Sequence, residues 1–85
     1  MDAYALVLNE VAAMRLAAAT RAEQRQIALI LDGMKAAPFR PGDLQERDAQ
    51  GRINEVLVVG NWLVTYWPDH AVRELRVVRL EQVGD

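Results

Sequence analysis

The feature that most constrains the fold is a run of β-branched and aromatic residues between residues 53 and 80, which two short turns divide into three parts. Gly60-Asn61 is a tight-turn pair, and Pro68-Asp69-His70-Ala71 is a second turn signal. Apolar side chains in this run recur with the period of two that a strand imposes. We therefore expect an antiparallel meander of three strands over residues 53–59, 62–67 and 72–80.

A short strand and a first helix are predicted near the start of the chain. The apolar segment 3–8 ends at Asn9, whose side chain suits the N-cap of a helix. That helix is expected over residues 10–19, with Val11, Met14 and Ala18 on one face.

A second helix is expected from Thr20 onward, because Thr20 and Glu23 have the spacing of a capping box. Pro38 cannot continue a helix, so the helix is expected to end at about residue 36. The polar and charged stretch 44–51 is expected to be a loop that ends in a turn. The amphipathic stripe of the second helix consists of Ile27, Ile30, Leu31 and Met34.

These elements predict a single α+β domain over residues 1–85, in the order β-α-α-β-β-β. The sheet is expected to be antiparallel with three or four strands, and the helical hairpin is expected to pack on one of its faces. Both faces of the last strands carry apolar residues, and two helices can cover only one face. The other face is therefore expected to stay partly apolar and exposed, which is typical of a partner site or of a homodimer interface.

Composition and charge narrow the classes of function. The 85 residues include 10 Lys and Arg against 12 Asp and Glu, so the chain lacks the positive excess typical of proteins that bind RNA or ribosomes. Without cysteine there is no disulfide and no cysteine-based metal site. No apolar run approaches the roughly 18 residues of a membrane span, and the N-terminus has no basic segment typical of a signal peptide. We therefore expect a cytoplasmic protein without a cofactor or metal.

Few side chains indicate chemistry. His70 is expected to be an exposed turn residue rather than a general base, because no metal ligand or nucleophile lies at a recognisable spacing from it. The chain has no serine and therefore no Ser/His/Asp triad. Four carboxylates lie among arginines, where a self-neutralising solvated loop is a better interpretation than acid–base catalysis or Mg²⁺ binding. They are Asp43, Glu46, Asp48 and Glu55.

Three arginines lie along the last strand, with Arg73 and Arg79 predicted on one face and Arg76 on the other. Contact with phosphate or an acidic peptide is one interpretation. Charges that protect an edge strand from aggregation are an equally good one. The aromatic residues of the middle strand are expected to pack in the core or at an interface rather than to stack on bases. The candidates for partner binding are Trp62, Trp67, Arg73 and Arg76.

The order of elements and three local strings resemble the RelE/ParE superfamily of toxins from type II toxin–antitoxin systems. Met34-Lys35-Ala36-Ala37-Pro38 is similar to the family's exit from its second helix. The string from Gly60 to Asp69 is similar to the family's central strand, and Val77-Val78-Arg79-Leu80 is similar to its final strand. The resemblance covers almost the whole chain and implies the helical hairpin on an antiparallel sheet.

The chain departs from the pattern of the family's ribosome-dependent ribonucleases. Leu63 occupies the position of the strand arginine, residues 53–59 contain no Lys or Arg, and residues 81–85 contain no basic residue, tyrosine or histidine. The resemblance therefore implies a toxin-like protein that binds an antitoxin peptide and a cellular target without cleaving mRNA. The alternatives are an endoribonuclease and a self-associating structural domain. For the endoribonuclease, the catalytic candidates are Arg52, Tyr66 and Arg79.

Overall fold

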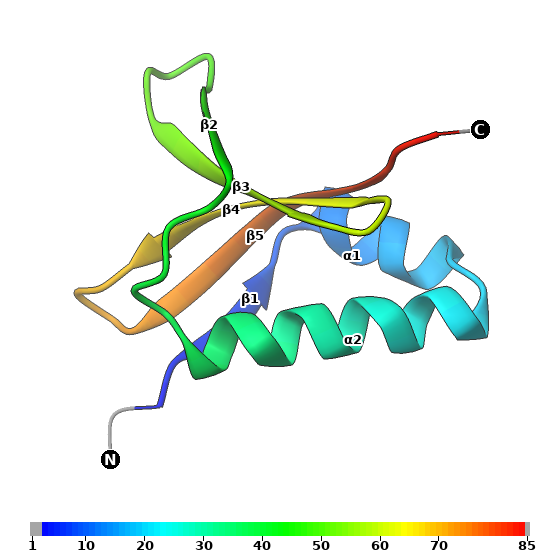
Figure 1. The fold of residues 1–85 in the computed structure, drawn as a ribbon. Coiled ribbons are helices and arrows are strands. Elements are labelled where there is room, and N and C mark those ends of the chain that lie inside the picture. Colours follow the sequence, from blue (N-terminus) through cyan, green and yellow to red (C-terminus); the bar gives the residue numbers. More distant parts are fainter. Residues whose placement is uncertain (1–2, 85) are drawn as a thin grey trace.

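A mixed five-stranded sheet forms the centre of the computed structural model, which describes residues 3–84. Its strands lie in the order β1-β5-β4-β3-β2, and both helices lie on one side of it (Figure 1). The domain is α+β, as the sequence predicted. The elements are β1 (Ala5–Leu8), α1 (Glu10–Ala18), α2 (Arg21–Ala36), β2 (Leu44–Arg47), β3 (Ile53–Val59), β4 (Trp62–Asp69) and β5 (Glu74–Gln82).

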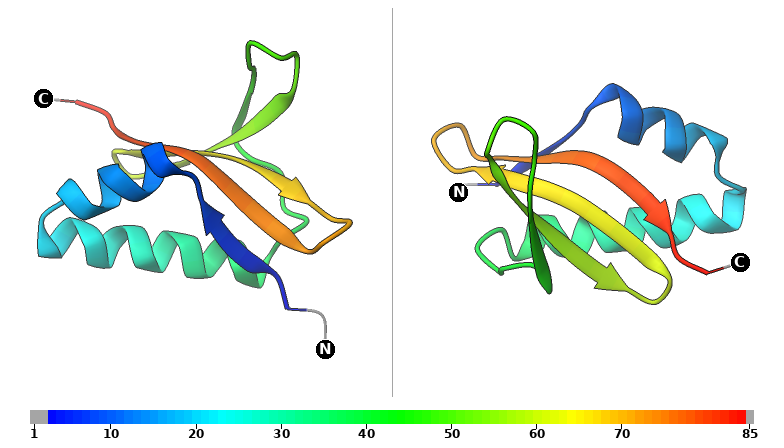
Figure 2. Two further views of the ribbon diagram at one scale, coloured as in Figure 1. Left: turned by 180° about the vertical axis from the view of Figure 1, so that it is seen from behind. Right: turned by 90° about the horizontal axis from the view of Figure 1, so that it is seen from above.

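The sheet differs from the predicted one in two respects. The first is β1, which pairs with β5 in parallel, so the sheet is mixed rather than antiparallel (Figure 2). The second is β2, which lies in the stretch that was predicted to be a loop and adds a fifth strand. Such a strand shows no alternation of apolar residues in its sequence, because an edge strand tolerates and often favours charged side chains.

Both helices begin at the predicted caps. The Asn9 side chain accepts a hydrogen bond from the Ala12 amide, and Thr20 and Glu23 form both halves of the capping box. The buried residue of α1 is Ala12, whereas Val11 and Met14 are 58% and 65% exposed. The predicted apolar face of α1 therefore points to solvent, and α1 packs on the core through Ala12 and Leu16 instead.

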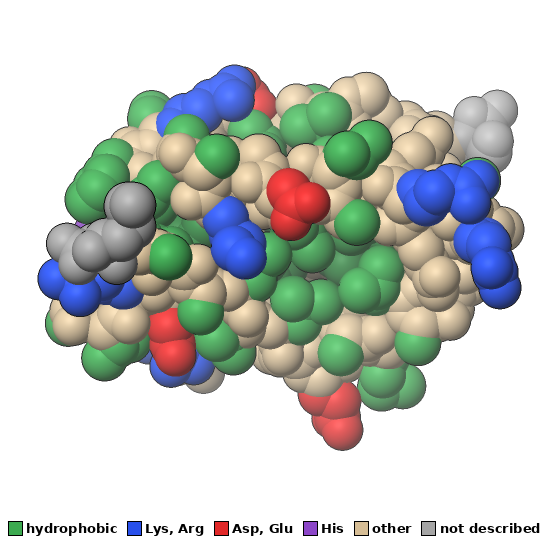
Figure 3. All heavy atoms as spheres, turned by 90° about the horizontal axis from the view of Figure 1, so that it is seen from below, with side chains coloured by type: hydrophobic (Ala, Val, Ile, Leu, Met, Phe, Trp, Pro, Cys, Tyr) green, Lys and Arg blue, Asp and Glu red, His purple; other side chains and the backbone are tan. Residues whose placement is uncertain are grey.

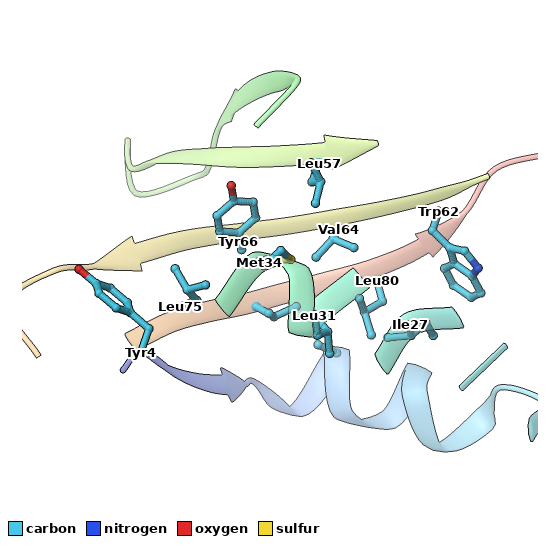
Figure 4. Packing of buried hydrophobic residues seen from close by; sticks show 12 residues of the cluster. Tyr4, Ile27, Leu31, Met34, Leu57, Trp62, Val64, Tyr66, Leu75 and Leu80 are labelled. Atoms are coloured by element: carbon cyan, nitrogen blue, oxygen red, sulfur yellow. The ribbon is translucent and has the colours of Figure 1, made fainter. Parts of the chain in front are cut away.

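The core lies between the sheet and the helices (Figure 4). A bulge in the pairing of β4 with β5 sets Thr65 opposite Arg79 but Tyr66 opposite Val77, so the intervening residue of β5 has no partner. Because of this extra residue, Leu75, Val77 and Leu80 all reach the core. The prediction that Arg76 and Arg79 lie on opposite faces is therefore wrong: both lie on the sheet face away from the helices.

Candidate functional site

An apolar groove lies beside α2, between this helix and the neighbouring part of β3 and β4. It has a volume of about 260 Å³. Leu29, on the outer rim, is 73% exposed, although most leucines of a small domain are buried. Seen from the helical side, hydrophobic side chains gather in the middle of the molecule (Figure 3). The apolar walls include Leu29, Ile30, Met34, Leu57, Val59 and Leu75.

Arg40 lies at the groove and brings a positive charge to it. Its guanidinium makes no hydrogen bond or ion pair with any other residue from 3 to 84. The hydroxyl of Tyr66 donates a hydrogen bond to the main-chain carbonyl of Arg40 at 3.3 Å, which links the floor of the groove to the loop after α2. The groove therefore combines apolar walls with one cation, Arg40, that is unpaired among the described residues.

Tyr66 provides a pH-dependent test of this packing. Burial raises the pKa of the Tyr66 hydroxyl above its ordinary value of 10.0, and the Glu55 carboxylate raises it further, while Arg40 lowers it. The fold thus favours the neutral phenol, so its contribution to stability is present below about pH 10 and is lost as the pH rises through the folded pKa. We expect the free energy of unfolding to fall less steeply between pH 9 and pH 11 in Tyr66→Phe than in the native protein. Equal slopes for the two proteins, measured by urea denaturation at each pH, would contradict this expectation.

An aromatic cluster holds the loop that carries Arg40. Phe39 stacks on the His70 ring with centroids 4.8 Å apart, and the Tyr4 hydroxyl is hydrogen-bonded to His70 Nδ1 at 2.6 Å. His70 is exposed and lies in the β4–β5 turn, where it was expected. Its role in the structure is to connect this turn to the N-terminal segment and to the loop after α2.

The opposite face of the sheet carries four of the candidates, Arg52, Trp67, Arg76 and Arg79. The Arg52 guanidinium lies 4.1 Å from the centre of the Trp67 ring, and that of Arg76 lies 5.6 Å from it. Arg79 pairs with Glu46 at 2.6 Å and with Glu81 at 2.9 Å, and these hydrogen bonds raise the pKa of Arg79. The β2–β3 hairpin, which supplies Glu46, rises on this side of the sheet (Figure 1).

Most of the positive charge on this face is therefore neutralised within the chain. Arg76 contacts Glu74 at 2.7 Å and Asp69 at 3.9 Å, so both of these β5 arginines have carboxylate partners. A smaller cavity of about 200 Å³ adjoins Arg52, Trp67 and Arg76. Of the two cations that line it, Arg76 is paired with carboxylates and Arg52 lies over the Trp67 ring.

The structure separates the residues that the sequence analysis grouped together. Arg52, Trp67, Arg76 and Arg79 share the outer face, but Tyr66 and Trp62 lie on the helical side. Trp62 is 2% exposed, and its indole Nε1 donates to Gln26 Oε1 at 3.0 Å. It is a core residue, so it is not available to a partner. Arg73 is exposed in the β4–β5 turn, and its carbonyl accepts a hydrogen bond from the Ala5 amide.

The four carboxylates near β2 accept hydrogen bonds or pair with an arginine within the domain. Asp43 Oδ2 accepts a hydrogen bond from the Val58 amide, and Glu55 Oε1 accepts one from the Gly42 amide. Asp48 Oδ1 accepts from two amides of the β2–β3 turn. Within residues 3–84, no group of three or more potential ligands could hold a metal ion.

The groove residues Leu29, Gly33 and Arg40 were missed by sequence analysis. Two signals pointed to Leu29 and Gly33, namely a leucine outside the amphipathic stripe of its helix and a glycine inside that helix. Neither signal specifies a groove until β3 is placed beside α2.

The chain was also compared with known proteins. No protein-family model matches it, and no curated protein matches it either. In the described part of the chain, no helix has both the length and the apolar character that a membrane crossing requires.

Proposed function

We propose that this chain is a toxin-like component of a type II toxin–antitoxin system, with a RelE/ParE-like fold, that acts by binding an antitoxin peptide and a cellular target. The observation that carries the proposal is the apolar groove with the exposed Leu29 on its rim. Apolar clefts with a few polar groups at their edge are preferred sites of binding. The helical pair on one face of the sheet also agrees with the resemblance described above.

The outer face supports binding without mRNA cleavage. Stabilising a phosphate in a reaction requires cations that are free to meet it. Here Arg79 is held by Glu46 and Glu81, and Arg76 by Glu74. An RNA phosphate would have to displace these carboxylates and would be repelled by them.

Leu29→Glu tests the proposal at the groove. The chain is co-expressed with the reading frame beside its gene, and the pair is purified through a tag on this chain. We expect the native chain alone to arrest growth and the pair to co-purify, with retention falling at least about tenfold in Leu29→Glu because a carboxylate at the rim cannot be desolvated cheaply.

Met14→Glu is the matched control, since Met14 is similarly exposed on α1 but does not line the groove. It should retain the partner. Normal growth together with no co-purifying peptide would contradict the proposal, and so would full retention by Leu29→Glu. A homodimer in light scattering that Leu29→Glu converts to a monomer would instead support the self-associating domain.

A second candidate, an endoribonuclease, is favoured by one observation: Arg52, Arg76 and Arg79 lie on the same face, and the first two contact Trp67. Induced expression followed by primer extension on cellular mRNA tests it. Cleavage sites that appear with the native chain and disappear with Arg79→Gln would favour the ribonuclease. Intact mRNA during growth arrest is the result that we expect.

A further inference from the structure

Most of the backbone hydrogen-bonding groups of β3 beside the groove are already paired within the domain. On one side β3 pairs with β4, and on the other it pairs with β2. Beyond β2 the segment at Asp43 continues the contact, because its amide donates to the Val56 carbonyl at 2.8 Å and its carboxylate accepts from the Val58 amide at 2.7 Å. A peptide in the groove must therefore satisfy its own amides and carbonyls. A helix does this, whereas an added strand would leave them unpaired.

The size of the groove favours side chains of a larger partner over a free small molecule. Its volume of about 260 Å³ lies below the range of roughly 300–1,000 Å³ typical of pockets that enclose a small ligand. The side chain of Leu29 lies exposed at the rim, so a small molecule bound inside the groove would not cover it. A helix lying along the groove would insert apolar side chains and cover Leu29 as well.

Gly33 indicates where such a helix would approach most closely. Glycine inside a helix is less stable than alanine, and here a Cβ would have no atom within 4 Å. Packing within the chain therefore gives no reason for glycine at this position. Gly33 lines the groove, so the missing side chain leaves room for a partner backbone.

Arg40 supplies the charge that the partner must match. Since its guanidinium has no ion-pair partner within residues 3–84, an incoming carboxylate would meet it without displacing another acid. An arginine at the edge of an apolar contact loses part of its hydration when it is covered, so a neutral partner would leave it unsatisfied. The partner helix should therefore present an acidic residue here.

We propose that the groove binds an amphipathic helix of a partner protein, with a small residue against Gly33 and a carboxylate against Arg40. This inference takes the existence of a protein partner from the proposed function and adds its chemistry. Leu29 and the apolar walls supply the contact area. Gly33 allows the backbone of the partner helix to approach closely, and Arg40 selects a partner with a carboxylate at this position.

The test uses fluorescence anisotropy with labelled synthetic peptides. The probe is an alanine-rich peptide with leucines at i, i+3 and i+7, an alanine between them, and one glutamate a turn beyond the last leucine. Matched peptides replace the glutamate with glutamine or lysine, replace the central alanine with leucine, or break the helix with proline. The protein variants are Gly33→Ala, Arg40→Gln and Arg40→Glu, with Met14→Glu as the control.

We expect saturable binding of the glutamate peptide. The affinity should fall at least about tenfold when the peptide contains proline, when its glutamate is replaced by glutamine, or when the protein carries Arg40→Gln. The glutamine peptide and Arg40→Gln together should cause little more loss than either alone. Arg40→Glu should prefer the lysine peptide. Gly33→Ala should bind more weakly although its melting temperature rises, a combination that a purely structural glycine would not give. The inference would be overturned if the glutamate peptide did not bind, or if the proline peptide bound equally well. It would also be overturned if the losses of affinity from Arg40→Gln and from the glutamine peptide were additive.

Failure of this inference can be told apart from failure of the proposed function. If the co-expressed partner is retained equally by Gly33→Ala and Arg40→Gln while growth arrest persists, only the inference is wrong. If the peptides bind as expected but expression neither arrests growth nor yields a partner, the groove is as inferred and the toxin-like function is wrong.

Discussion

Trp62→Ala is expected to lower the free energy of unfolding by about 3–5 kcal/mol, a loss large enough to unfold much of the protein. Trp62 is the largest of the fully buried side chains and fills one end of the core (Figure 4). Alanine would leave a cavity that the surrounding strands and helices cannot close. It would also remove the hydrogen bond to Gln26 and the stacking of Arg15, whose guanidinium lies 5.1 Å from the ring centre.

Trp67→Ala is the matched control for this prediction, because it removes the same side chain from the same strand but from the outer face. Trp67 is only partly buried, so the loss should be less than half as large. Urea denaturation followed by far-ultraviolet circular dichroism measures both losses. Equal losses of stability in Trp62→Ala and Trp67→Ala would contradict the prediction, because Trp67 would then contribute as much to stability as the core tryptophan does. Gln26→Ala removes the hydrogen bond to the Trp62 indole but keeps the ring, and it should lower the free energy of unfolding by about 1 kcal/mol.

Gly42→Ala is expected to lower the free energy of unfolding by about 1–3 kcal/mol, although it adds only a methyl group. A Cβ at Gly42 would lie 2.8 Å from both the amide nitrogen and the carbonyl oxygen of Val56, and neither backbone atom can move independently of the sheet. The segment would have to shift away from β3. That shift would weaken the hydrogen bonds from Gly42 to Glu55 and from Val58 to Asp43.

Hydrogen exchange locates this effect, because the Val58 amide should lose protection in Gly42→Ala more than the amides of β5 do. Gly33→Ala is the control, because it makes the same glycine-to-alanine change inside a helix. The added Cβ there would have open space around it, so the free energy of unfolding should rise by up to about 1 kcal/mol. Opposite signs at the two glycines are the expected result. A stability gain at Gly42 would contradict the close approach seen in the structure.

Much of the framework could be predicted because its signals are local. The capping box at Thr20 and Glu23, the turn at Gly60-Asn61 and the end of α2 before Pro38 each depend on residues a few positions apart. The strand β2 could not be predicted in this way. Its Gln-Glu-Arg sequence is unremarkable for a loop, and it forms a strand only because the segment lies against β3.

The candidate site was less predictable than the framework. The bulge between β4 and β5 brings Arg76 and Arg79 to one face, and simple alternation along the strand assigns them to opposite faces. Pairing of Arg79 with Glu46 joins residues 33 positions apart in the sequence, which no local pattern reveals. For the same reason the exposed Leu29 and Arg40 became significant only when the groove was seen.

By itself, the sequence determined the class of fold, the two helices and the meander, because hydrogen bonding and side-chain alternation within short segments depend on neighbouring residues. It also determined the near-neutral charge of the chain. Three properties emerged only from the three-dimensional fold: which of the two tryptophans is buried, which arginines are paired, and where an apolar surface remains uncovered. Those properties depend on contacts between distant segments, and their free energies are set by the burial that the completed fold imposes.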